Sequence, residues 1–199
     1  MEAWLQAVVR QIILYSLPLI ASLSIVGAIE SLSLSHEKRP KQAFFALTWK
    51  GAWLPLVASL AMQRGVIIAL PRPLTPGPGP AAVRLLCHVL LAAIGWILYI
   101  WALGHQAPAG LPPLHFWWAK VLMYFNLCMA CLHVLPLPGM VVGESLFRAR
   151  PGNRLLALLS SQPVTCFTLL AVTPLLDAGP GAYMIYPLYE YLASLATRL

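Results

Sequence analysis

Two stretches of this chain contain residue types that can bind a metal ion or support catalysis. The first is the pair His36 and Glu37, which is followed by Lys38, Arg39 and Pro40. A zinc hydrolase needs two histidines on successive turns of one helix, with a glutamate base beside the first. Here the second histidine is absent, and the proline would interrupt the helix. The pair therefore fails as a zinc motif.

The second stretch covers residues 126–146 and reads NLCMACLHVLPLPGMVVGESL. Pro136 and Pro138 interrupt its apolar run, and the backbone groups that they leave without partners must bond to neighbouring protein rather than to lipid. Interrupted segments at membrane depth often line functional cavities. The candidate cavity or partner-binding residues are Asn126, His133, Pro136, Pro138, Gly139 and Val141.

His133 is an ionisable residue in an apolar run, which makes it a candidate for function. We favour a neutral histidine that bonds to a backbone carbonyl freed by Pro136, and we interpret His88 in the same way. Two such histidines could also be the axial ligands of a haem. Cys128 and Cys131 are not followed directly by a histidine, so they do not form a haem attachment motif.

The remaining histidines and carboxylates do not share a metal-ligand spacing. His105 and His115 fall in a predicted loop. Glu144 precedes Arg148 by four positions, so we interpret it as a solvated or Arg148-paired carboxylate rather than a catalytic base. We therefore expect no catalytic residue, no metal and no cofactor.

Composition indicates a membrane protein. Hydrophobic residues make up 60% of the 199 residues and charged residues 10%, and the mean hydropathy is +0.77. We expect residues 1–199 to form one membrane domain without a separate soluble domain. The net charge is +7, but the 13 basic residues are scattered through the connecting segments. This pattern favours anionic lipid headgroups over nucleic acid as partners.

The apolar runs predict an all-α, polytopic bundle of about five to six membrane spans with proline-broken segments. Residues 71–80, PRPLTPGPGP, are predicted to be a connector that excludes helix. Gly179, Pro180 and Gly181 are predicted to separate the last run from a tyrosine-rich tail. Whether that tail, residues 182–199, crosses the membrane stays open, as does the membrane orientation. The predicted runs cover residues 12–29, 51–70, 85–103, 116–135 and 155–176.

Three separated places make the chain resemble the site-2 protease family of intramembrane zinc metalloproteases, in particular its compact bacterial branch. The family's third-ligand segment reads approximately NLLPIPPLDGGRIL, with another asparagine earlier on the same helix. Asn126 matches that asparagine, and residues 133–139, HVLPLPG, follow the segment. Residues 37–48 resemble the family's GDPTAKLQGRLTLNP stretch, and residues 71–76 reproduce the proline spacing of its PVPVNP connector.

The resemblance also indicates which positions of this chain correspond to the family's metal ligands. If Thr48 occupies the family's threonine position, the zinc motif falls on residues 25–29, IVGAI, and the family's aspartate position falls on Val141. None of these side chains binds a metal. His133 stands where the family has an asparagine close to the substrate cavity. The resemblance thus implies a relative that keeps the helical fold and has lost the zinc ligands and the general base.

The expected function is a scaffold, assembly factor or accessory subunit of an inner-membrane complex, which packs against helices of other integral membrane proteins. Two alternatives stay open. One is an active intramembrane metalloprotease with non-standard ligands, and the other is a haem-binding electron-transfer subunit that uses His88 and His133. The abundance of Ala, Leu, Pro and Arg favours a bacterial source, and hence the bacterial inner membrane.

Overall fold

In the computed structural model of the protein, every secondary-structure element of the described residues is a helix. Within those residues, the prediction of an all-α fold is confirmed. The helices are α1 (Glu2–Leu32), α3 (Pro78–Gly104), α4 (Leu114–Leu132), α5 (Val141–Ala149), the π-helix η2 (Asp177–Ile185) and α8 (Tyr186–Ala196). The structure describes residues 2–32, 65–69, 77–105, 111–137, 139–149, 171 and 173–199.

Two described helices, α1 and α3, are long and apolar enough to cross a bilayer. They extend the predicted runs at residues 12–29 and 85–103 in both directions. Helix α4 matches the fourth predicted run, although it carries Lys120 and Asn126. Two membrane-length helices are fewer than the five to six predicted spans. The runs at residues 51–70 and 155–176 fall almost entirely outside the described residues.

Helix α1 continues through Pro18 without ending. Proline removes one backbone donor from a helix, and side chains bond to carbonyls around this point. The Ser22 hydroxyl donates to the Pro18 carbonyl at 2.7 Å, and the Trp118 indole of α4 donates to the Ile13 carbonyl at 3.1 Å. The middle of α1 is therefore fixed partly by α4.

Helix α3 begins at Pro78, which corrects the prediction that residues 71–80 exclude helix. Pro78 and Pro80 both lie in the first turn. The first N–H groups of a helix have no intrahelical partner, so proline costs no hydrogen bond there. Residues 71–76 of the predicted connector lie outside the described residues.

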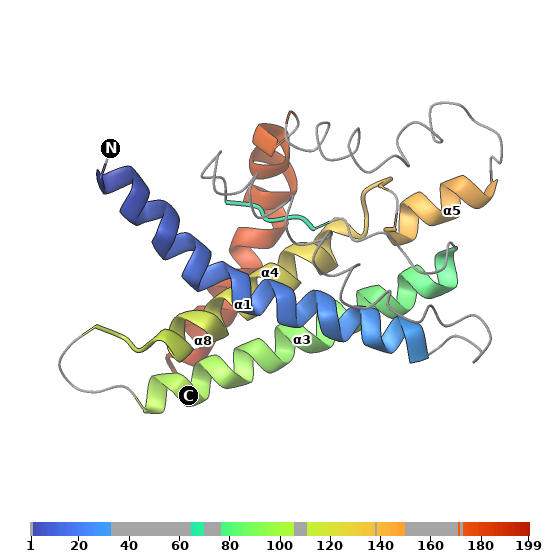
Figure 1. Ribbon diagram of the computed structural model, residues 1–199. Helices are drawn as coiled ribbons and strands as arrows, with labels where there is room; N and C mark the ends of the chain where they lie inside the picture. The colour runs from blue at the N-terminus through green and yellow to red at the C-terminus, as the bar shows by residue number, and fades with distance from the viewer. Residues whose placement is uncertain are drawn as a thin grey trace.

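Helices α3 and α4 run side by side, and α1 crosses both (Figure 1). The backbones of α3 and α4 approach closely at Gly95, where an added Cβ would lie 2.5 Å from the backbone nitrogen of Met123. A core of buried apolar side chains fills the junction of α1 and α4, including Leu19, Phe125 and Met129. These three helices position the polar side chains described below.

The segment Gly179, Pro180 and Gly181 does not separate two elements, as predicted, but lies inside η2. A π-helix bonds residue i to residue i+5, and such bulges accommodate local irregularities. The Asp177 carboxylate at its start accepts hydrogen bonds from the Val66 amide and the Tyr186 hydroxyl, each at 3.0 Å. These bonds join η2 and α8 to the segment of residues 65–69.

Candidate functional site

A set of buried polar side chains lies inside the apolar helical bundle. Helix α1 contributes Ser22 and Glu30, and α3 contributes two more members. The rest come from α4 and from the segment that joins α4 to α5. We call this set the buried polar network. Its described members are Ser22, Glu30, Arg84, His88, Asn126, His133 and Glu144.

Asn126 joins three helices. Its amide oxygen accepts a hydrogen bond from Nδ1 of His88 in α3 at 2.8 Å. Its amide nitrogen donates to the Ser22 hydroxyl of α1 and to the Leu122 carbonyl, both at 2.8 Å. Asn126 is fully buried, so the polar atoms of its amide must find partners inside the protein. The predicted candidate Asn126 is therefore the centre of the helix junction.

Arg84 forms a buried ion pair with Glu30, with 2.6 Å between Nη1 and Oε1. The side chains of Arg84 and Glu30 are 5% and 3% exposed. Arg84 also donates from Nε and Nη2 to the Gly139 carbonyl, at 3.2 Å and 2.9 Å. Three elements, α1, α3 and the segment after α4, therefore meet at one guanidinium.

Sequence reasoning missed this ion pair, because Arg84 was counted among the charges of the connecting segments. The sequence nevertheless contained an indication of this ion pair. Glu30 and Arg84 lie at the boundaries of two long apolar runs, and charges at membrane depth are expected to pair with each other. The pairing itself spans 54 positions of sequence, so no local spacing rule could detect it.

Glu144 is buried, which corrects the prediction of a solvated or Arg148-paired carboxylate. Its Oε1 accepts from the Gly139 amide at 2.8 Å, and its Oε2 accepts from the Gly77 amide at 2.6 Å. Gly77 is the N-cap of α3, so the carboxylate also lies at the positive end of that helix. The carboxylate holds the segment before α5 against the start of α3.

His133 follows α4 and connects the two ends of the proline-broken segment. Its Nδ1 accepts a hydrogen bond from the Val141 amide at 3.3 Å, and its carbonyl accepts from the Val142 amide at 3.4 Å. The expected partner was a backbone carbonyl freed by Pro136, so the observed bond has the opposite direction. The centres of the His133 and His88 rings are 6.1 Å apart. The structure thus brings the two histidines together.

Four predicted candidates, Asn126, His133, Gly139 and Val141, lie in or beside the buried polar network. Gly139 has a positive φ of 81°, a conformation that glycine adopts readily, and both of its backbone polar groups bond to network side chains. Pro136 is exposed. The candidate Pro138 and the pair His36 and Glu37 lie outside the described residues.

The residues at the positions of the family's zinc ligands do not fit a zinc ion. Ile25 and Ile29 are exposed on α1, Val26 is buried hydrocarbon, and Val141 meets His133 through its backbone. In the described part of the chain, no three His, Cys, Asp or Glu side chains lie close enough to hold a metal. Zinc centres in proteins use at least three such side chains.

No protein family, curated protein or solved structure matches this chain. The relation to site-2 proteases therefore stays a resemblance of sequence motifs. An outer surface encloses the buried polar network.

That surface is strongly apolar along α1 and α3. Large side chains at helical spacing are exposed on both helices. In water, such patches would mark interaction sites, and in a bilayer they contact lipid or other helices. The exposed residues are Leu5, Val9, Ile12, Leu17, Ile25 and Ile29 on α1, and Leu86, Leu90, Ile94, Ile97 and Trp101 on α3.

Proposed function

We propose that the chain is a non-catalytic, site-2-protease-like integral membrane protein of about five to six spans. It acts as a scaffold, assembly factor or accessory subunit of a bacterial inner-membrane complex. The observation that carries the proposal is the division of the molecule into two zones. Polar side chains bond to one another and to backbone inside, whereas the outer faces of α1 and α3 are apolar.

Membrane placement is supported by the low burial of the apolar helices. Within the most apolar windows of α1 and α3, only 33% and 39% of residues are buried inside the protein. A core helix of a soluble protein would bury most of such a window. Lipid tails and partner helices are as apolar as the exposed leucines, so both can cover these faces.

The hydrogen bonds and the ion pair of the buried polar network support the proposal that the chain does not hydrolyse peptides. Peptide hydrolysis of the family type needs a metal-bound water and a free carboxylate base. Both oxygens of Glu144 accept backbone N–H groups, and Glu30 is paired with Arg84. The amide of Asn126 is also fully engaged. The polar groups thus hold helices together, and a scaffold needs such a rigid frame.

A second candidate is a haem-binding or metal-binding subunit, because His88 and His133 are adjacent. Against it, the two residues are 1% and 3% exposed, and each already uses Nδ1 in a hydrogen bond. A porphyrin would have to displace packed helices to reach them. An absorption spectrum of the reduced, purified protein tests this candidate directly, since bound haem gives a Soret band.

The decisive experiment is purification of the full chain from native membranes in a mild detergent, followed by mass spectrometry and metal analysis. The scaffold proposal predicts stable co-purification with other integral membrane proteins and no stoichiometric metal. One zinc per chain that is lost in His133→Ala, together with peptidase activity, would instead establish the metalloprotease. Val134→Ala is the matched control, because Val134 is its exposed neighbour.

A further inference from the structure

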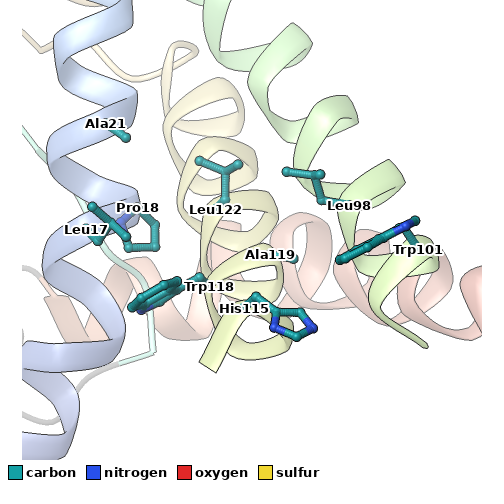
Figure 2. Close-up of a pocket in the computed structure, with 9 residues that line it drawn as sticks. All are labelled: Leu17, Pro18, Ala21, Leu98, Trp101, His115, Trp118, Ala119 and Leu122. Atoms are coloured by element: carbon teal, nitrogen blue, oxygen red, sulfur yellow. The ribbon is translucent and has the colours of Figure 1, made fainter. Parts of the chain in front are cut away.

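A cavity of about 250 Å³ lies between α1, α3 and α4 (Figure 2). Its lining includes two small side chains, Ala21 of α1 and Ala119 of α4, which leave space that larger residues would fill. An engineered apolar cavity of about 150 Å³ binds benzene, and pockets for drug-sized molecules begin at roughly 300 Å³. The cavity therefore has room for one or two rings, but not for a whole phospholipid.

The lining of the cavity is apolar on all three helices. Leu17 contributes from α1, Leu98 from α3 and Leu122 from α4. Among the described residues that line it, none is an aspartate, a glutamate, a lysine or an arginine. A charged ligand would lose its hydration there without gaining a counter-ion. The ligand that fits is therefore electrically neutral and mostly apolar.

Three aromatic side chains gather at one end of the cavity. Figure 2 shows Trp118 on the side of α1, Trp101 on α3, and His115 between them. The ring centres of Trp101 and His115 are 5.6 Å apart. Trp101 is 54% exposed, and His115 is also exposed, so this end of the cavity reaches the surface. A ligand that enters here meets flat rings first.

Both indoles are held in place by contacts outside the cavity. The Trp118 indole donates to the Ile13 carbonyl at 3.1 Å. The His105 ring stacks on Trp101 with 4.6 Å between the ring centres, and its Nδ1 donates to the Trp101 carbonyl at 2.8 Å. Aromatic rings attract each other in stacked or edge-to-face contacts, and pre-oriented side chains lose little entropy on binding. The two indoles therefore suit a flat aromatic or quinonoid ring.

His115 supplies the polar contact of the cavity. In the described part of the chain, its ring nitrogens form no hydrogen bond. A neutral imidazole has one N–H donor and one acceptor nitrogen, so it can bind a ring carbonyl or hydroxyl. An acyl chain offers neither a flat ring nor such an oxygen. A neutral ring with carbonyl groups and an apolar tail, which is the structure of a membrane quinone, matches every part of the lining.

We propose that α1, α3 and α4 form a binding site for the ring of a membrane quinone. One quinone carbonyl accepts the N–H of His115, and the ring contacts Trp101 and Trp118. The tail leaves along the exposed side chains of Leu17 and Leu98. The ring is bound and not reduced at this site. This inference depends on the membrane placement in the proposed function, since the quinone arrives through the bilayer, but not on the scaffold role.

The first test measures dissociation constants of the purified full chain in detergent for decyl-benzoquinone and decylbenzene, which differ in the ring carbonyls. One hydrogen bond contributes about fivefold to affinity. We expect decyl-benzoquinone to bind about fivefold more tightly, and His115→Phe to abolish this difference without weakening decylbenzene. Leu114→Phe is the matched control, because Leu114 is the exposed neighbour of His115 and does not line the cavity.

The second test fills the cavity. Ala21→Phe places a ring in the space, so we expect both probes to bind about tenfold more weakly or not at all. Ala93→Phe is the same substitution at an exposed position of α3 and should leave both affinities unchanged. An azido derivative of decyl-benzoquinone requires no variant. It should label peptides that contain Trp101, His115 or Trp118, and unlabelled decyl-benzoquinone should suppress this labelling.

The alternative occupants are outcomes of the same measurements. Equal affinities for the two probes would identify a general hydrocarbon site and overturn the quinone. Tighter binding of decanoate or of phosphatidylglycerol would overturn the preference for a neutral ligand. Labelling elsewhere, or the same loss in Leu114→Phe as in His115→Phe, would overturn the assigned position.

Extraction with alkaline carbonate separates failure of the site from failure of the membrane placement. Release of the chain from membranes would overturn the placement and with it the route of the quinone. If the chain stays in the membrane, the binding and labelling experiments judge the site alone. Partner co-purification judges the scaffold role independently of both.

Discussion

The guanidinium of Arg84 donates a hydrogen bond to the Glu30 carboxylate at 2.6 Å and so joins α3 to α1 inside the protein. Removal of one partner leaves a buried charge without compensation, which costs about 3–5 kcal/mol. We therefore expect Arg84→Met and Glu30→Leu each to lower the free energy of unfolding by that amount. The measurement is a denaturation curve in mixed detergent micelles.

The double variant Glu30→Leu, Arg84→Met is the control for this prediction. Replacement of a buried pair by apolar residues is often nearly neutral, so the double variant should be more stable than either single variant. If its loss of stability equals the sum of the two single losses, the ion pair does not couple α1 to α3.

Asn126 is expected to be critical for the packing of α1, α3 and α4. Asn126→Leu leaves the His88 ring and the Ser22 hydroxyl without their shared partner. A buried polar group that loses its hydrogen bond costs about 1–3 kcal/mol, so we expect a lower midpoint of thermal unfolding. Ser145→Ala, at an exposed position on α5, serves as the control and should change stability by at most about 0.5 kcal/mol. Equal midpoints for the two variants would contradict the central role of Asn126.

Gly95 is expected to tolerate no side chain, because α3 and α4 are in close contact there. An alanine Cβ would lie 2.5 Å from the Met123 nitrogen, and backbone atoms cannot move aside cheaply. We expect Gly95→Ala to destabilise the chain by about 1–3 kcal/mol. Gly104→Ala, in the same helix with nothing within 4 Å, should be neutral or slightly stabilising. Similar unfolding curves for the two variants would show that the helices can separate at Gly95.

Glu144 either binds backbone amides, as in the structure, or pairs with Arg148, as the sequence spacing predicted. The two arrangements predict different effects of an Arg148 substitution on stability. In the structure, the Glu144 carboxylate accepts from the Gly77 and Gly139 amides. Glu144→Gln replaces one acceptor oxygen by a donor group, so we expect a loss of about 1–3 kcal/mol. Arg148→Ala should leave stability unchanged, since Arg148 is exposed. A comparable loss in Arg148→Ala, measured by thermal unfolding, would favour the solvated ion pair instead.

Local patterns in the sequence predicted the apolar helices well. The runs at residues 12–29 and 85–103 became α1 and α3, because about 20 apolar residues in succession have few alternatives to helix. The predictions from local patterns were wrong at two prolines. Pro78 and Pro180 were predicted to break helices, yet the first lies in an initial turn and the second in a π-helix.

The sequence alone determined that this chain is apolar and helical, and it identified Asn126, His133, Gly139 and Val141 as candidate residues, because hydropathy and proline spacing are local properties. Only the tertiary structure decided which polar groups meet. The contacts between Arg84 and Glu30 and between Glu144 and Gly77 span 54 and 67 positions of the chain. Such contacts depend on how the helices cross, and the crossing results from the packing of the whole core around Gly95 and Asn126.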